Sequence, residues 1–316
     1  MSAALDVDRR MLVVPAVVLV VAALLGYVLG HQPSHRAPVH EPMSTTSVAG
    51  VLLQVPVRWK PAATGQEIPG LGLHDSVEFA PSGNPAGAGL IAGALPAGQA
   101  SPLPSSMLAR LRRQPTTSVV DLQEGQAYRY TDLSVSGVDA SLTVYVVPSP
   151  GAEPTALACY ASPSQAAELA TCERIVSTLT LAGRSQSYDL TPQPEYARQL
   201  SAAVSALDAK RTAARAQMNA STSPEQVRSL AEELAGAFAR AAGTLSGLEP
   251  TLATGAAQSA LSGAILKAHS AYSALAKAAG RRSVAAYSAD RVQVEAAESE
   301  VDAALRDYSL LGYRQA

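Results

Sequence analysis

The sequence predicts an α+β protein with an N-terminal transmembrane helix, then an antiparallel-sheet α+β domain, then an all-α antiparallel helical bundle. Three observations predict this order: an uncharged apolar run over residues 11–30, short β-type segments over 48–183, and Ala-rich amphipathic segments over 194–316. A chain of 316 residues is long enough for about two domains. Its net charge of −2 supplies no concentration of Lys and Arg for phosphate binding, so we expect no nucleic-acid partner.

The apolar run reads MLVVPAVVLVVAALLGYVLG and contains no charged side chain. A helix of this length is roughly 30 Å long, which matches the hydrocarbon core of a bilayer. Arg9 and Arg10 precede the run, whereas only Arg36 follows soon after it, and this imbalance favours a cytoplasmic N-terminus. We therefore expect a single-pass plasma-membrane protein with residues 1–10 in the cytoplasm and the bulk of the chain extracytoplasmic.

A cleaved signal peptide is the alternative interpretation of the same run. Val28 and Gly30 are tolerable at the −3 and −1 positions of a cleavage site. The run is longer than the apolar core of about 7–15 residues that such peptides carry, which favours an uncleaved anchor. No Cys stands at the end of the run, which excludes a lipid-anchored lipoprotein.

The two cysteines, Cys159 and Cys172, agree with an extracytoplasmic location. In an oxidising compartment, two cysteines are most simply explained by a disulfide. A redox pair and half of a metal site are the alternatives. Neither is favoured, because the spacing is not C-x-x-C and no nearby His completes a zinc site. We expect a structural disulfide that joins the end of a strand to the following helix.

Residues 31–47 are rich in Pro, Ser, Thr and His and show no apolar periodicity. This composition is typical of a flexible linker that separates a folded domain from the bilayer. His31, His35 and His40 fall in this segment, but a flexible tract gives a metal ion no fixed geometry. We therefore expect neither a metal site nor a cofactor here.

Residues 48–183 break into short runs of β type between turn residues. Alternation is clearest in Ala140–Val147, where Leu142, Val144 and Val146 share one face. Helical spacing predicts one helix over Leu103–Arg113 and another that begins at Ser162. Strands next to strands with few helices predict an α+β sandwich on an antiparallel sheet. The predicted strands are Gly50–Val57, Ser76–Ala80, Gly89–Leu95, Thr117–Leu122, Ala127–Leu133, Ala140–Val147 and Thr155–Tyr160.

Two phrases in this region carry a family resemblance. The opening VLLQVPVRWKP, a middle helix before several antiparallel strands, and a closing helix that ends in IVSTLTL resemble the PsbP/LpqN-type extracytoplasmic domains of bacteria over residues 48–183. The resemblance implies a binding or accessory module and brings no catalytic residues with it. Members of this type are often lipoproteins, whereas this chain has an apolar helix in that place.

The chain becomes Ala-rich and helical from Pro194 onward. Four stretches, 196–218, 227–248, 261–279 and 284–308, repeat apolar residues every three or four positions. Four such helices with short connections predict an up-down bundle over 194–316. Ala-rich seams bury little area per residue, so we expect this bundle to be only moderately stable alone. The ending DAALRDYSLLGY resembles the tails of anchored proteins of unknown function from high-GC bacteria.

The usual catalytic motifs are missing from the sequence. It contains no G-x-S-x-G, H-E-x-x-H, Walker A or G-x-G-x-x-G pattern. Carboxylates do cluster at Glu232–Glu233 and again at Glu295, Glu298, Glu300 and Asp302, but their spacing mostly fits a solvated helix face. We therefore expect the protein not to be an enzyme.

Charged residues at apolar positions of the bundle are the first candidates for a binding role. Arg211 and Arg291 fall where the stripe requires an apolar residue, and Glu298 follows Arg291 by seven positions. A buried charge must be paired, so an Arg–Glu contact could fix the helix register or line a polar pocket for an anionic ligand. The alternative is that these long side chains extend to solvent at the bundle edge.

Aromatic residues are the second set of candidates. Aromatics make up only 4% of the chain, and such residues are favoured in binding surfaces. Trp59, Tyr128 and Tyr130 are therefore candidate recognition residues. For Trp59, which lies between Pro56 and Pro61, packing at a sheet edge is the alternative.

These features together predict a membrane-anchored extracytoplasmic protein that acts by binding. Its partner would be an envelope or membrane protein, or a small ligand that the sequence does not identify. One alternative is a sensory module that signals through a membrane partner, since only about ten residues remain inside. An envelope hydrolase ranks last, because no nucleophile–base pair is recognisable.

Overall fold

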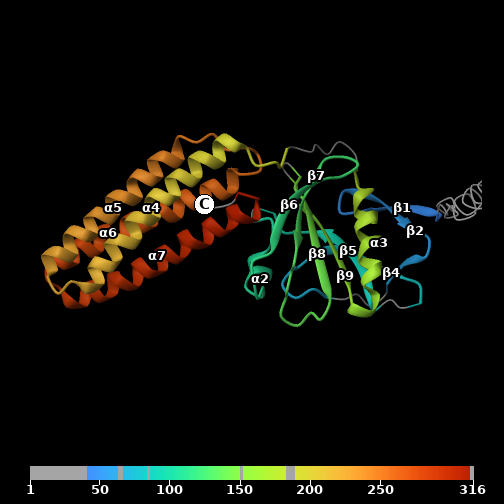
Figure 1. Cartoon of the computed structure of the whole chain (residues 1–316), viewed down its shortest axis with the longest axis horizontal. Coiled ribbons are helices and arrows are strands. Elements are labelled where there is room, and N and C mark those ends of the chain that lie inside the picture. Colours follow the sequence, from blue (N-terminus) through green and yellow to red (C-terminus); the bar gives the residue numbers. More distant parts are fainter. Residues whose placement is uncertain are drawn as a thin grey trace, which may run out of the picture. The chain divides into compact units, whose positions relative to one another are not determined.

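The computed structural model of the chain describes residues 41–62, 67–83, 86–97, 99–149, 152–182 and 189–313 (Figure 1). The predicted cytoplasmic tail, the predicted membrane helix over 11–30 and most of the predicted linker lie outside these residues. Within the described ranges, no helix has both the length and the apolar character that crossing a bilayer requires.

The sheet region is built on seven antiparallel strands in the order β3-β4-β5-β9-β8-β7-β6. Two meanders meet where β5 pairs with β9. All seven predicted strands of residues 48–183 are present in the fold, six of them in this sheet, while the short edge strand β3 was not predicted. The strands are β3 (Trp59–Pro61), β4 (His74–Pro81), β5 (Ala88–Ala94), β6 (Thr116–Asp121), β7 (Gln126–Thr131), β8 (Ser141–Val147) and β9 (Thr155–Ala161).

A smaller sheet of three strands has the order β1-β2-β10. It consists of β1 (Met43–Val48), β2 (Val51–Pro56) and β10 (Thr180–Leu181). The predicted linker over 31–47 is therefore too long at its C-terminal end, because the chain is already in a strand at Met43. The β-branched Thr45 and Thr46 suit this conformation, and β2 supplies the hydrogen-bonding partners of β1.

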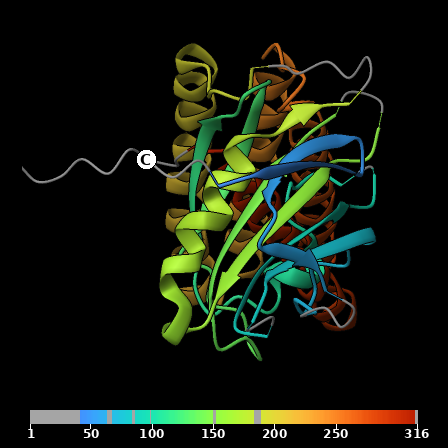
Figure 2. The ribbon, with the colours of Figure 1, turned by 90° about the vertical axis from the view of Figure 1, so that its right-hand side faces the viewer.

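The main sheet is a middle layer with a hydrophobic core on each face. In β8, Leu142, Val144 and Val146 belong to one core, as their predicted common face requires, while Tyr145 and Val147 belong to the other. α3 (Ala166–Ser177) covers the second face after a short 3-10 turn, η1 (Pro163–Gln165), and Figure 2 shows it on the same side as β1 and β2. The predicted helix after Ser162 is thus confirmed.

The predicted helix over Leu103–Arg113 is wrong in its extent. Only α2 (Ser105–Leu108) is helical. Beyond it, Leu111 forms a β-bridge with Val135, and the N–H of Arg112 donates to the carbonyl of Ser134. These bonds to a distant segment replace the helical ones, while Met107 still reaches the core as the spacing predicted.

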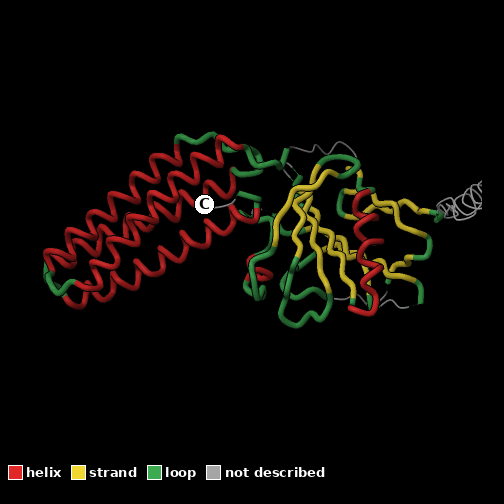
Figure 3. The backbone as a smooth tube through the Cα atoms, viewed as in Figure 1, coloured by secondary structure: helices red, strands yellow, loops and turns green. Residues whose placement is uncertain are grey.

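The C-terminal region consists of four consecutive helices, which Figure 3 shows joined by short loops. Three of them begin within three residues of the predicted apolar stripe, and α6 (Gly255–Gly280) begins six residues before its stripe. The Oγ of Ser223 accepts a hydrogen bond from the N–H of Gln226 and so caps the second of them. The helices are α4 (Pro194–Ala220), α5 (Pro224–Ser246), α6 (Gly255–Gly280) and α7 (Val284–Leu310).

The bundle and the sheet region share one continuous core. The sheet face that carries Tyr128 and Tyr130 belongs to the same cluster of buried residues as Tyr196, Tyr308 and Leu310 from the helices. The ring of Tyr308 lies near those of Tyr196 and Tyr313, with centroids 6.3 and 6.0 Å away. Residues 43–313 therefore form a single packed unit, in which the Ala-rich helices do not stand alone.

Candidate functional site

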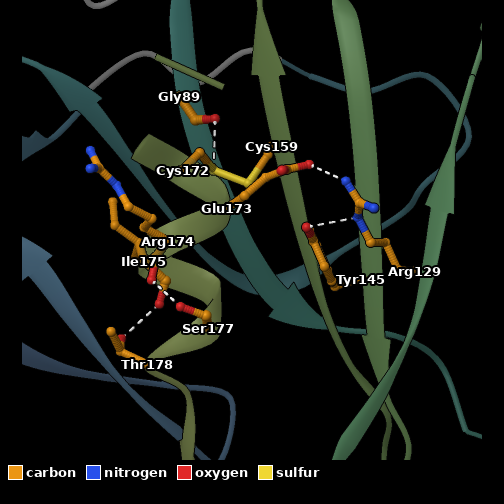
Figure 4. Close-up of a disulfide and its surroundings, with 10 residues drawn as sticks. All are labelled: Gly89, Arg129, Tyr145, Cys159, Cys172, Glu173, Arg174, Ile175, Ser177 and Thr178. Atoms are coloured by element: carbon orange, nitrogen blue, oxygen red, sulfur yellow. Dashed lines mark hydrogen bonds and ion pairs between the residues drawn. A yellow bond between two sulfur atoms is a disulfide. The ribbon is translucent and has the colours of Figure 1, made fainter. Parts of the chain in front are cut away.

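The predicted disulfide between Cys159 and Cys172 is confirmed (Figure 4). It joins β9 in the sheet to the middle of α3, with Cα atoms 5.7 Å apart, and neither cysteine is accessible to solvent. The Sγ of Cys172 also lies 3.6 Å from the carbonyl oxygen of Gly89 on β5, which is a packing contact because a disulfide sulfur carries no hydrogen. The disulfide thereby fixes α3 on the sheet.

Glu173, the residue after Cys172, points from α3 toward β7 and forms an ion pair with Arg129 there (Figure 4). The Nη2 of Arg129 donates to the Oε1 of Glu173 at 2.7 Å, and its Nε donates to the hydroxyl of Tyr145 at 3.1 Å. Arg129 and Tyr145 are direct cross-strand neighbours on β7 and β8. Two partners therefore hold the guanidinium, while its Nη1 makes no hydrogen bond to any described residue.

The pKa values of Arg129 and Tyr145 in this cluster are both raised. The hydrogen bond to Glu173 raises the pKa of Arg129, so the guanidinium stays charged. Burial raises the pKa of Tyr145 to about 12, and the negative charge of Glu173 adds to this effect while Arg129 opposes it. Tyr145 is therefore a neutral hydroxyl that positions Arg129.

A polar cleft with a volume of about 680 Å³ opens beside this cluster. That volume is within the range of small-ligand sites. Arg129, Thr131 and Thr143 contribute the sheet side of the cleft, and Glu173 contributes from α3. The remaining lining comes mainly from residues 112–113, 132–134 and 138–142, which include Arg112, Arg113, Asp132 and Asp139.

The charges around the cleft are of both signs. Asp132 is engaged by Arg113 at 3.7 Å and by the hydroxyl of Thr116 at 2.9 Å. Arg112 forms no ion pair with the described part of the chain. Such a cleft can hold a negatively charged group against Arg129 and a positively charged group near Asp139, as a zwitterionic or peptide-like ligand would require. Among the described residues, no group of three or more His, Cys, Asp or Glu side chains could hold a metal ion.

The sequence analysis missed Arg129, Tyr145 and Glu173 as site residues. A pattern for Arg129 was present, because alternation places it on the face of β7 opposite Tyr128 and Tyr130, where a charge needs a partner. That partner lies 44 positions further along the chain, and only the attachment of α3 to the sheet brings the two together.

Tyr128 and Tyr130 lie in the core and not on the surface. Their exposed fractions are 1% and 0%, and they point to the face of the sheet that the bundle shares. Tyr128 also lines a small hollow of about 150 Å³ with Leu252 and Leu311. The structure thus places both predicted recognition residues where they connect the sheet to the helices.

Trp59 is also buried, with 2% of its surface exposed. It opens the edge strand β3 and pairs with Pro81 of β4, which is the sheet-edge packing that the sequence analysis gave as its alternative. Its Nε1 makes no hydrogen bond to any described residue.

Arg211 of α4 and Glu298 of α7 meet across the bundle, and both are buried. The Nε of Arg211 lies 3.5 Å from Glu298, while its Nη1 and Nη2 contact Asp208 and Asp302 at 2.9 Å each. Glu298 also accepts from Arg215 at 2.8 Å and from the hydroxyl of Tyr272 at 2.6 Å. Both charged groups are buried and paired within the protein, across two helices, so this network fits the predicted register role.

Arg291 does not take part in this network, contrary to its predicted seam position. Its side chain is 55% exposed and lies 3.9 Å from Glu295, one turn along the same helix. The fully buried seam of α7 begins at Val294, about three turns after Val284, where the predicted stripe began. Arg291 therefore lies at the solvated edge, which was the alternative interpretation.

No protein-family model matches this chain, and no curated protein matches it. The resemblance of residues 48–183 to PsbP/LpqN-type domains accordingly stays a prediction from the sequence phrases and the order of the elements.

Proposed function

We propose that this chain is a membrane-anchored, extracytoplasmic binding or accessory protein of the cell envelope that works without catalysis. The buried disulfide between Cys159 and Cys172 supports the compartment, because such bonds persist in oxidising environments. The uncharged run over residues 11–30 supports the anchor.

One observation supports the binding role: two hydrogen bonds hold the guanidinium of Arg129 in place and leave its Nη1 available. Its Nη2 donates a hydrogen bond to Glu173 and its Nε donates one to Tyr145. Its Nη1 remains available beside a cleft of about 680 Å³. An arginine that is already positioned loses less entropy when it binds an anionic group. The ligand of this cleft is a small polar molecule with a carboxylate or a similar anion, and a positive group on it suits Asp139, which also lines the cleft.

Binding of glutamate, a small zwitterion, tests this role. The full chain in lipid nanodiscs would be titrated with L-glutamate and with inorganic sulfate, and binding followed by the amide resonances of a labelled sample. We expect saturable shifts with glutamate, and affinity about tenfold lower in Arg129→Gln, since a charge-assisted hydrogen bond is lost. Arg174→Gln is the matched control, because Arg174 lies on the other side of α3 (Figure 4). Equal binding by both variants would overturn the proposed site.

The proposed topology has a separate test. Trypsin added to spheroplasts should digest the bulk of the chain and leave only a fragment that contains the N-terminal apolar run. Protection of residues 43–313 until the cells are lysed would place the folded part in the cytoplasm and end the proposal of an envelope role.

A further inference from the structure

We propose a second binding site, for an amphiphile with one negatively charged head, in the hollow between α2 with its following loop and the last turns of α7. The hollow has a volume of about 520 Å³ and lies within the packed unit of residues 43–313. Its ligand class differs from that of the polar cleft, and the two sites are tested independently.

The floor of the hollow is apolar. Leu108 and Leu111 contribute from α2 and the loop, Pro115 from the approach to β6, and Leu310 from the end of α7. Leu108 and Leu111 are only partly buried, although they pack against the main core. An apolar ligand body placed here would complete their removal from water, which is the main source of affinity in such sites.

The rim carries an excess of positive charge. The charged side chains that line the hollow are Arg113, Arg306 and Asp307. Arg113 already forms an ion pair with Asp132. Arg306 is exposed and forms no ion pair with any described residue. Gln114 donates a hydrogen bond to Ser309 and so bridges the two walls. Arg306 interacts electrostatically with the neighbouring Asp307. Since its guanidinium is exposed and forms no ion pair with a described residue, it can still receive a negatively charged head at the edge of the apolar hollow.

Other ligand classes satisfy only half of this arrangement. A small polar anion leaves the leucine floor in contact with water, and a neutral apolar molecule forms no ion pair with Arg306. A single acyl chain with a carboxylate satisfies both. Dodecanoate is a suitable probe, because its chain is short enough for a hollow of this volume.

Photo-crosslinking locates the probe directly. The full chain in lipid nanodiscs would be irradiated with a dodecanoate that carries a diazirine near the end of its chain, and the adducts mapped by peptide mass spectrometry. We expect adducts to concentrate on the peptides that contain residues 105–115 and 303–310. Unlabelled dodecanoate should compete, and uncharged dodecanol should compete about fivefold less well, the difference that an exposed ion pair makes.

Two variants test separately the contact of the protein with the carboxylate head of the probe and its contact with the acyl chain. Arg306→Gln should reduce labelling about fivefold, with Arg240→Gln, an exposed arginine of α5, as the matched control. Ala109→Trp should fill the hollow and abolish labelling there, with Ala202→Trp on the exposed side of α4 as its control. Melting temperatures near that of the wild type would show that both variants are folded.

The opposite results overturn the proposal. Adducts spread evenly over the chain, equal competition by dodecanol, or unchanged labelling in folded Arg306→Gln or Ala109→Trp would each exclude this site. Arg129→Gln should leave the labelling unchanged, so a failure of the polar cleft and a failure of this hollow give different results.

Discussion

The hydroxyl of Tyr130 in β7 donates a hydrogen bond of 2.7 Å to the carbonyl oxygen of Leu310 in the last turn of α7. Carbonyls at a helix C-terminus have no partner within the helix, and here a sheet residue supplies one. Both residues are buried, with exposed fractions of 0% and 2%. The sheet and the bundle are therefore joined at a place where water cannot replace the bond.

Tyr130→Phe should lower the free energy of unfolding by about 1–2 kcal/mol, because it leaves a buried carbonyl unsatisfied. The wild type should unfold in one transition, with the same midpoint for near-UV and far-UV circular dichroism, since the core is shared. Tyr287→Phe, at a half-buried position of α7, is the control and should change little. Two separate transitions in the wild type would contradict the shared core.

Arg211→Met should lower the free energy of unfolding by about 2 kcal/mol. This is less than the full cost of breaking a buried ion pair, because Arg215 still neutralises Glu298. Arg291→Met, at an exposed position, should leave the melting temperature unchanged. Equal effects of the two substitutions in thermal denaturation would mean that the buried network does not fix the register of α4 against α7.

Removal of the disulfide by Cys159→Ala with Cys172→Ala should destabilise the chain by roughly 3 kcal/mol, the loop-closure value for a separation of 13 residues. Because both sulfurs are buried, dithiothreitol should reduce the native protein slowly and the unfolded protein quickly. Alkylation with iodoacetamide followed by mass spectrometry measures this. Two thiols that react at once in the untreated native protein would rule out the bond.

Alkaline pH should destabilise the fold through Tyr145. Its pKa is raised to about 12 in the folded state, against about 10 in an unfolded chain. Below pH 10 the Tyr145 hydroxyl keeps its proton in the folded and the unfolded state, and the stabilisation is complete. Between about pH 10 and 12 it ionises only in the unfolded state, so the free energy of unfolding falls by about 2–3 kcal/mol. Tyr145→Phe should therefore show a shallower loss of stability in urea titrations over this interval. Parallel curves for the variant and the wild type would contradict the shift.

The strands that the sequence predicted well are those with regular alternation and clear turns on both sides, such as β7 and β8. The ones it missed, β1, β3 and β10, are short or lie at sheet edges, where pairing with a neighbour and not composition determines the conformation. α2 was overextended for the same reason: residues 110–112 bond to residues 134–136, and a local pattern contains no information on that partner.

The candidate cleft was the least predictable part. Its lining comes from β7, β8, α3 and two loops, and its central ion pair joins Arg129 to Glu173. The bundle network was predictable in part, because Arg211 and Glu298 were identified as unusual charges at apolar positions. Glu298 pairs with Arg211 of α4, however, and not with Arg291, which lies on the same helix as Glu298. Spacing along one helix gives the face of a residue and not the helix that it contacts.

The hairpin of β1 and β2 determines how the folded part would respond to mechanical load. Met43 pairs with Pro56, and the turn at Ala49 and Gly50 is at the far end of the hairpin. A force applied through Pro42 would therefore break the cross-strand pairs one after another, starting at Met43. The pairs would not all have to break at the same time. Under tension β1 would yield at low force, while the disulfide would keep α3 attached to the main sheet.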